Sequence, residues 1–199
     1  MANKDELVKC EKILDKKFLR FFDAAYKNKE TGKERHYFFV SRNDEADLAI
    51  FNEKVKISAV EAFTYIKIGN EYKIVMIDEF RSALNRRMLS FCAGLVDEGE
   101  DAETAIKREL YEEVGGIVKK IEFIRKNPLP TSAGLTDEAN VFAVVELSDL
   151  EKQHLQAEED IKVRIFTLDE ARKILNDENT NITINSLLGL HLLVRELSR

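Results

Sequence analysis

Three glutamates in the middle of the chain have a spacing that suits metal chemistry. Glu109, Glu112 and Glu113 stand at positions i, i+3 and i+4. On an ideal α-helix the last two therefore lie about 60° to one side and about 40° to the other side of the first. Their like charges repel and destabilise an isolated helix. A hard divalent cation such as Mg²⁺ binds a few carboxylates together with phosphate and water, so such an ion would offset the repulsion.

The surrounding residues decide between a metal site and a solvated glutamate-rich helix face, which is the better interpretation of the glutamates taken alone. Gly94 is followed after five residues by Glu100, and after seven more by Arg108. Arg108 stands beside the cluster and can orient one carboxylate through a bidentate pair. A bound cation would neutralise phosphate charge and generate hydroxide near neutral pH. The complete spacing therefore favours metal-dependent phosphate chemistry.

The helix that must carry these residues is expected over residues 102–114. Asp101 is a suitable N-cap, and Gly115 is a suitable C-terminal stop. An apolar stripe beside the glutamates can anchor the helix on a sheet. This stripe consists of Ile106, Leu110 and Val114.

Strands and helices are mixed along the rest of the chain. The expected strands are 63–68, 72–80, 117–124, 141–147 and 162–168, and the expected helices are 169–176 and 184–197. Residues 82–91 are expected to form an irregular connection. Residues 127–138 are expected to form a long loop, and such loops in compact domains are often functional. This order of elements predicts an α/β (α+β) fold.

The first 45 residues differ from the rest because they contain seven aromatic side chains. Residues 27–33 (KNKETGK) are expected to form a turn between two extended segments. The part before residue 27 is ambiguous between helix and strand, and a hairpin is favoured. We therefore expect residues 1–45 to form an N-terminal antiparallel β segment and residues 46–199 to form the main domain.

Length and composition limit the class of protein. The chain has 199 residues, 44% of them hydrophobic, which is enough for one domain with its own core. Its net charge of −6 argues against broad nucleic-acid binding. The N-terminus lacks the apolar run of a signal peptide, and the apolar stretch 187–194 is too short to cross a membrane. Two cysteines without a spacing pattern predict neither a disulfide framework nor a zinc site. A cytoplasmic location is expected.

The segment from Gly94 to Gly116 resembles the Nudix box. That pattern is Gly, five residues, Glu, seven residues, Arg-Glu, an aliphatic residue, any residue, Glu-Glu, any residue, Gly and an aliphatic residue. The chain departs from it only at the last position, where Gly116 precedes Ile117. That position packs rather than reacts, so the departure leaves the catalytic pattern intact. The resemblance implies a Nudix α/β/α sandwich with a mixed sheet.

Outside the box, the chain resembles the ADP-ribose pyrophosphatase branch of the Nudix family from about Tyr26 to the C-terminus. The segments that carry this resemblance follow the order of that branch. They are 79–81 (EFR, for Gln-aromatic-Arg), 93–97 (AGLVD), 132–138 (SAGLTDE), 159–161 (EDI) and 168–171 (LDEA). Two positions differ, because the branch commonly has Glu where Ser90 stands and often Pro where Cys92 stands. Cys92 has no matched histidine partner, so core packing is expected for it.

The resemblance also implies the metal ligands. The metal would be Mg²⁺, with Mn²⁺ as a substitute. Its ligands would be Glu109, Glu113 and the backbone carbonyl of Ala93, with Glu112 assisting. Arg108 and Glu100 would support the cluster.

Other implied residues act on substrate and water. Arg81 would contact the diphosphate, since a guanidinium fork suits phosphate, and Arg42 is a second candidate. The general base would come from the loop before a late strand, where Glu159 matches best. Glu158 and Glu138 are the alternatives. The scattered histidines are expected to be structural or at the surface, and the Arg86-Arg87 pair is expected to be solvated.

The implied reaction is hydrolysis of the pyrophosphate bond of a nucleoside-diphosphate sugar. ADP-ribose is favoured, with AMP and ribose 5-phosphate as products, and the branch implies a homodimer formed through the N-terminal segment. One alternative is a different nucleotide sugar, such as UDP-glucose or GDP-mannose. Another is a Nudix module that binds a nucleotide without cleaving it. The intact Glu109, Glu112 and Glu113 argue against this last interpretation, because a binding module does not need a repulsive cluster.

Overall fold

The computed structural model describes residues 3–199, and these residues form two compact units. The N-terminal unit contains the chain up to residue 58 together with residues 128–140. The C-terminal unit contains residues 59–127 and 141–199. The predicted division between residues 45 and 46 stays a prediction.

The N-terminal unit is built on an antiparallel sheet, as the sequence predicted, but the sheet has three strands where a hairpin was favoured. The strands pair in the order β1-β2-β3, and Gly32, in the left-handed region at φ +69°, lies in the turn between β2 and β3. Their bounds are β1 Asp5–Lys16, β2 Leu19–Asn28 and β3 Glu34–Ser41. Phe22 and Phe39 stack at 5.2 Å between ring centroids and form a small core with Ala24 and Leu48. The aromatic residues of this segment therefore give it a core of its own.

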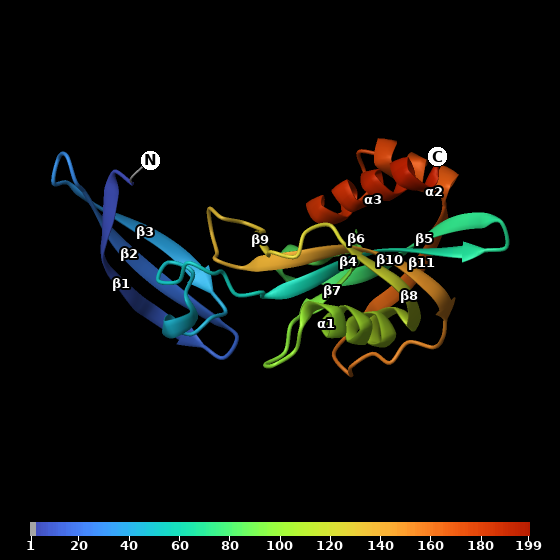
Figure 1. Cartoon of the computed structure of the whole chain (residues 1–199), viewed down its shortest axis with the longest axis horizontal. Helices are drawn as coiled ribbons and strands as arrows, with labels where there is room; N and C mark the ends of the chain where they lie inside the picture. The colour runs from blue at the N-terminus through green and yellow to red at the C-terminus, as the bar shows by residue number, and fades with distance from the viewer. Residues whose placement is uncertain (1–2) are drawn as a thin grey trace. The chain divides into compact units, whose positions relative to one another are not determined.

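The C-terminal unit is a sheet covered by helices on both faces (Figure 1). The strand order is β11-β5-β4-β10-β8, with β6 beside β5 and β7 beside β4. Helix α1 packs against β4 and β7, whereas α2 and α3 pack against β11, β4 and β6 on the other face. The strands are β4 Ala59–Ile68, β5 Glu71–Arg81, β6 Arg86–Ser90, β7 Cys92–Leu95, β8 Gly116–Phe123, β10 Ala139–Leu150 and β11 Ile161–Thr167. The helices are α1 Ala102–Glu109, α2 Leu168–Asn176 and α3 Ile184–Leu197. The predicted α/β/α sandwich is confirmed.

Three further short elements belong to the fold besides the π-helical turn that follows α1. They are the 3₁₀ turns Glu45–Asp47 and Ser82–Leu84, and the two-residue strand β9, Leu129–Pro130, which pairs with the first residues of β10. Among residues 3–199, no helix is both long and apolar enough to span a bilayer.

The prediction of an irregular connection over residues 82–91 was wrong. After the turn Ser82–Leu84, Asn85 adopts a left-handed conformation at φ 49°, and Arg86–Ser90 returns along β5 as strand β6. Asparagine tolerates this conformation better than other residues with a side chain. Asn85 is therefore the one sequence signal for the reversal.

The helix of the Nudix-like segment also differs from its prediction. Asp101 caps it as expected, since its carboxylate accepts a hydrogen bond from Thr104 N at 2.8 Å. However, α1 ends at Glu109, and residues Leu110–Val114 form a π-helical turn, η3. Such turns interrupt α-helices mostly at functional sites. Because a π turn is wider than an α turn, Glu112 and Glu113 do not follow the angles of an ideal helix.

Candidate active site

Arg108 is the centre of a network of carboxylates at the end of α1. Its Nε and Nη2 donate to the two carboxylate oxygens of Glu100 at 3.0 and 2.9 Å, and its Nη1 donates to Glu109 Oε1 at 2.6 Å. Nη2 also donates to the carbonyl of Leu95 at 2.9 Å. The guanidinium lowers the pKa of Glu100. Arg108 therefore holds Glu109 beside β7, the strand that begins at Cys92, which is the geometry an orienting residue needs.

Gly94 has to be a glycine because Glu109 lies directly over it. A Cβ atom at Gly94 would lie 1.9 Å from Glu109 Cδ. The clashing atoms belong to the end of the Glu109 side chain, so any residue larger than glycine at position 94 would displace the Glu109 carboxylate from this place. This contact explains the spacing between the glycine and the glutamate in the sequence pattern. It places Gly94 of β7 next to the Glu109 carboxylate.

Glu113 is buried without a full set of partners. It is 6% exposed, and its Oε2 accepts no hydrogen bond from residues 3–199. Burial, together with the charges of Glu109, Glu79 and Glu159, raises the pKa of Glu113 to about 8, although a hydrogen bond with the Cys92 thiol opposes the shift. Burial likewise raises the pKa of Glu109. The carboxylates of Glu109 and Glu113 therefore lie close together, and the cationic side chains near them are too few to neutralise both charges.

Glu79 belongs to this cluster, although the sequence did not single it out. It lies at the end of β5, half-buried, with Arg81 Nη2 at 2.7 Å from its Oε2. Burial raises its pKa, and Glu159 adds to that effect while Arg81 opposes it. The signal was present in the segment 79–81, where the resembling branch has Gln in place of Glu79.

The loop that carries Glu159 is attached to the π-helical turn through backbone carbonyls. Glu151 N donates to the carbonyl of Gly115 at 2.7 Å, and His154 N donates to that of Glu112 at 2.8 Å. The side chain of Gln153 donates to the carbonyl of Glu113 at 2.5 Å. Residues 151–154 therefore lie along the same turn that presents Glu113 to the cluster.

Side chains reinforce both ends of this loop. The His154 ring stacks on Tyr111 with centroids 4.4 Å apart. Arg87 bridges Asp78 at 2.8 Å and Asp160 at 2.6 Å. The expectation that Arg87 is a solvated cation was therefore wrong, because its partners come from β5 and the loop, which are distant in sequence.

Gly115 allows the loop to dock, and its replacement tests this contact. It has φ +68°, and a Cβ there would lie 2.3 Å from the carbonyl oxygen of Glu151. We expect Gly115→Ala to cost about 2 kcal/mol or more, which lowers the thermal midpoint by about 5 °C or more. Gly99→Ala is the matched control, since Gly99 has φ +80° and a Cβ there would meet no atom within 4 Å. Equal shifts in the two variants would show that the loop contact contributes nothing.

The remaining sequence-predicted residues have simpler surroundings. Glu112 is partly exposed and lies 3.6 Å from Arg108, and Glu158 is exposed. Arg42 and Glu138 both belong to the N-terminal unit, where they form an ion pair at 3.0 Å. Cys92 is buried in the C-terminal unit beside Glu113, as expected for a packing residue.

The cluster fits a hard divalent cation by the chemistry of its donors. The carboxylates near Glu113 offer oxygen, the Cys92 thiol lies beside them, and Glu113 Oε2 is a buried acceptor without a donor among residues 3–199. Within the part of the chain that the structure describes, no three His, Cys, Asp or Glu side chains already stand at metal-ligand spacing. Arg108 and Arg81 hold Glu109 and Glu79 instead. A cation would have to compete with these two arginines for the carboxylates.

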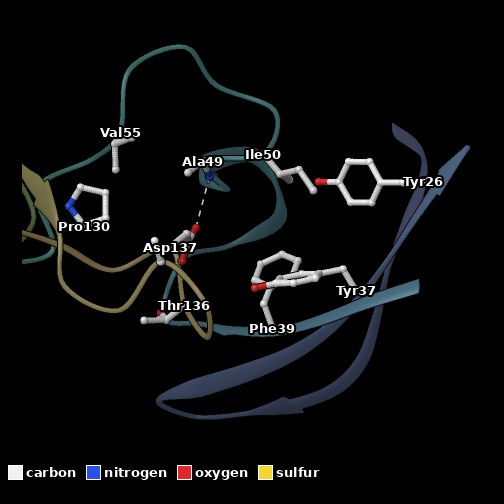
Figure 2. A pocket seen from close by; sticks show the side chains of 10 residues that line it. Tyr26, Tyr37, Phe39, Ala49, Ile50, Val55, Pro130, Thr136 and Asp137 are labelled. Atoms are coloured by element: carbon white, nitrogen blue, oxygen red, sulfur yellow. Dashed lines mark hydrogen bonds between the residues drawn. The ribbon is translucent and has the colours of Figure 1, made fainter. Parts of the chain in front are cut away.

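The N-terminal unit contains a cavity of about 290 Å³, which Figure 2 shows from close by. Tyr26, Tyr37 and Phe39 supply aromatic walls. Asp137 also lines it, and its Oδ2 accepts a hydrogen bond from Ala49 N at 3.2 Å. Aromatic faces with few polar groups are typical of ligand pockets. Sequence reasoning assigned these aromatic residues to a dimer-forming segment and did not foresee the cavity.

Comparison with known proteins identifies the family. The family model described as "NUDIX domain" matches residues 59–185, which is more than half of the chain and ends at the start of α3. The chain belongs to the Nudix family. Its Nudix domain therefore includes β7, α1 and η3, which carry the carboxylate cluster.

Two curated relatives match more than half of the chain. The chain is 37% identical over 116 residues to "ADP-ribose pyrophosphatase" of Bacillus subtilis (strain 168), a match that covers 57% of the chain and 62% of that protein. It is 32% identical over 119 residues to "Methanol dehydrogenase activator" of Bacillus methanolicus, covering 59% and 63%. The chain thus spans somewhat more than three fifths of the length of each relative.

A solved structure supports the fold over the whole chain. The "Crystal structure of ADP compounds hydrolase" superposes with a TM-score of 0.72 and covers 100% of this chain and 96% of that one, at 18% identity. At this identity the likeness concerns the fold. It extends to the N-terminal residues that lie outside the matched Nudix domain.

Proposed function

We propose that this Nudix protein is a Mg²⁺-dependent hydrolase of nucleoside-diphosphate sugars, with ADP-ribose as the favoured substrate. The products would be AMP and ribose 5-phosphate, and Mn²⁺ would replace Mg²⁺. The observation that carries the proposal is the convergence of Glu109, Glu113 and Glu159 beside β7. The similarity to the ADP-ribose pyrophosphatase of Bacillus subtilis favours the substrate.

The proposed roles follow from where each group lies. Glu109, Glu113 and the carbonyl of Ala93 would hold the metal, and Glu112, which is partly exposed, would assist. The metal supplies charge neutralisation for the diphosphate and lowers the pKa of water. Arg108 keeps Glu109 in place through the 2.6 Å contact.

Glu159 is the proposed general base. It lies close enough to Glu79, Glu109 and Glu113 to influence the pKa of each. Its Oε2 accepts a hydrogen bond from Gln156 N at 2.8 Å, which orients the carboxylate. A base has to reach the attacking water directly or through one further water, and the loop position allows this.

Arg81 and Arg42 are the proposed contacts for substrate phosphates. Each guanidinium is bound by one carboxylate in this structure: Arg81 by Glu79 and Arg42 by Glu138. A diphosphate carries more charge than a single carboxylate and matches the guanidinium fork. We therefore propose that substrate replaces these partners.

A substrate panel tests the proposal and its alternatives. Purified protein is assayed with ADP-ribose, UDP-glucose and GDP-mannose in Mg²⁺, in Mn²⁺ and in EDTA. We expect ADP-ribose to give the highest kcat/KM and EDTA to abolish turnover. A higher kcat/KM for a UDP- or GDP-sugar would transfer the assignment to that substrate. Tight nucleotide binding without any turnover would support the non-catalytic interpretation.

We also predict a homodimer formed through the N-terminal sheet. Several large apolar side chains on β1, on β3 and in the β1–β2 turn are exposed, and such patches mark interaction surfaces. They include Val8, Ile13, Leu14, Phe18 and Phe38. Sedimentation velocity should show a dimer that Phe18→Lys dissociates.

Leu188→Lys is the matched control for that experiment. Phe18 and Leu188 are similarly exposed, at 66% and 61%, but Leu188 lies on α3. The control should remain a dimer. A stable wild-type monomer with full activity would contradict the prediction, and dissociation by Leu188→Lys alone would move the interface to α3.

A further inference from the structure

The cavity of the N-terminal unit is lined by a carboxylate whose hydrogen-bond donors are all neutral. Asp137 is partly buried and forms part of the cavity wall. Its Oδ2 accepts hydrogen bonds from Asn43 Nδ2 and from Ala49 N, both at 3.2 Å. Its Oδ1 is buried and accepts no hydrogen bond from residues 3–199. The two donors hold the side chain in place, but they do not neutralise its charge.

The arginines near the two ends of β3 are bound to other acids. Arg35 pairs with Asp5 at 2.9 Å, and Arg42 pairs with Glu138 at 3.0 Å. Neither arginine lines the cavity. A partly buried carboxylate without a cationic partner is costly, and a buried oxygen without a donor often marks an unfilled ligand position. The negative charge of Asp137 is therefore available to a cation that enters the cavity from solution.

Aromatic rings form the walls around this carboxylate (Figure 2). The rings belong to Tyr26, Tyr37 and Phe39. The face of an aromatic ring attracts a cation within about 6 Å of its centroid, and Arg35 already lies 4.8 Å from the centroid of Tyr26. The other walls are largely apolar and include Ile50, Val55 and Pro130. Aromatic faces, apolar walls and one carboxylate together favour a cation that carries an apolar body.

Hydrogen bonds between β3 and the loop 132–136 hold the cavity in shape. The Tyr37 hydroxyl donates to the carbonyl of Gly134 at 2.8 Å, and Val40 N donates to the carbonyl of Leu135 at 2.9 Å. A site that exists before binding loses less conformational entropy when the ligand arrives. The last torsion of an aspartate side chain is broad, so a small rotation of Asp137 turns an oxygen toward the ligand.

We propose that this cavity binds a small organic cation, namely a primary ammonium group on a compact apolar or aromatic body. The ammonium group donates to Asp137, and the body lies against the rings of Tyr26 and Tyr37. The volume of about 290 Å³ is at the lower end for ligand pockets, which suits a small amine. Every residue that lines the cavity belongs to the N-terminal unit. The inference therefore does not depend on the proposed hydrolase activity.

Charge favours a cation over a neutral amino group such as that of a nucleotide base. A neutral amino group would donate to Asp137 but leave its charge without a partner. A charged donor gives a stronger hydrogen bond to a carboxylate, and it also gains from the aromatic faces. The ligand class is therefore decided by comparing charged and neutral molecules of the same shape.

The experiment measures binding to the full chain by titration calorimetry at neutral pH. The probes are benzylammonium, its neutral analogue benzyl alcohol, the anion benzoate, and AMP. We expect benzylammonium to bind about tenfold or more tightly than benzyl alcohol, and benzoate not to bind up to about 10 mM. Equal affinity of benzylammonium and benzyl alcohol would overturn the proposal, and so would the absence of benzylammonium binding up to about 10 mM.

Asp137→Asn tests the carboxylate itself. The amide oxygen of asparagine can still accept from Asn43 and Ala49, while its NH₂ group replaces the oxygen that would receive the ammonium. We expect the variant to weaken benzylammonium binding by about tenfold or more. AMP that displaces benzylammonium from the wild type, and binds tenfold or more weakly (about the same factor) to Asp137→Asn, would assign the cavity to a nucleotide base and overturn the proposal.

Asp47→Asn is the matched control. Asp47 belongs to the same unit and pairs with Lys56 at 3.0 Å, but it does not line the cavity. Its replacement should leave benzylammonium affinity within about twofold of wild type, since exposed charges act weakly at a distance. An equal loss in Asp47→Asn and Asp137→Asn would reduce the effect to general charge and contradict a specific site.

Tyr26→Leu tests the aromatic wall and keeps the inference testable if Asp137→Asn does not fold. Leucine keeps an apolar wall but removes the aromatic face. We expect benzylammonium to bind about threefold or more weakly to this variant, with benzyl alcohol changed by less than about twofold. Thermal midpoints check that each variant is folded. Equal weakening of the two probes would make the ring an ordinary apolar wall and count against a cation site.

Discussion

Glu113→Gln is expected to lower Mg²⁺-dependent turnover of ADP-ribose by about 100-fold or more, with the fold retained. Glu113 is buried, and its Oε2 has no protein donor among the described residues. Glutamine keeps the shape but removes the charge that a metal requires, and loss of one charge-stabilising group in an active site has an effect of this size. The measurement is kcat at saturating Mg²⁺, with Mn²⁺ affinity determined in parallel. Turnover near the wild-type value would remove Glu113 from the metal site.

The same variant should change how stability depends on pH in EDTA. The folded protein raises the pKa of Glu113 from 4.5 to about 8. A carboxyl group with a raised pKa in the folded state contributes stability below its unfolded value, and this contribution is lost as the pH rises through the folded value. The wild-type thermal midpoint should therefore fall between about pH 5 and about pH 8 more than that of Glu113→Gln. If the thermal midpoints of the two proteins changed with pH in parallel, the fall in stability would not come from Glu113.

Glu159→Gln is expected to lower kcat by about 100- to 1000-fold while Mn²⁺ affinity and the thermal midpoint stay near their wild-type values. The side chain accepts one hydrogen bond, from Gln156 N, and the amide oxygen of glutamine can accept it too. The variant therefore removes the proton acceptor with little effect on the loop. A matching loss of metal affinity would instead make Glu159 a ligand.

Glu158→Gln is the control for position. Glu158 is the neighbouring residue and is exposed, so its replacement should leave kcat unchanged within about twofold if the base is Glu159. Loss of activity in Glu158→Gln alone would shift the assignment by one residue. If both variants are active, the base lies elsewhere, and Glu138 is the next candidate.

The local features of the box were predictable from sequence because they depend on short spacings. Asp101 caps the helix through a residue three positions later. The stripe of Ile106, Leu110 and Val114 is buried, with at most 2% exposure, because its periodicity matches a helix packed on a sheet. The strands of the sheet followed from alternation and turn residues in the same way.

The features that escaped prediction depend on contacts between distant segments. The π-helical turn exists where carbonyls of 112–115 receive the loop 151–154, about 40 residues away. Glu79 joins the cluster only because β5 ends beside η3 and the Glu159 loop. Arg87 similarly meets Asp160 across a separation of 73 positions. No local sequence pattern encodes these long-range contacts, so they could not be predicted from the spacing of residues.

The attachment of the Glu159 loop to backbone carbonyls has a consequence for amide hydrogen exchange. Glu151 and His154 lie outside every strand and helix, yet their amides donate to carbonyls of residues 115 and 112. These two amides should exchange slowly with deuterium, at rates set by opening of the Nudix helix end. The tip is closed on itself by the Gln156–Glu159 hydrogen bonds, so it should exchange independently and faster. The loop thus divides into a stem that opens only with the helix end and a tip that moves as a small unit and carries Glu159.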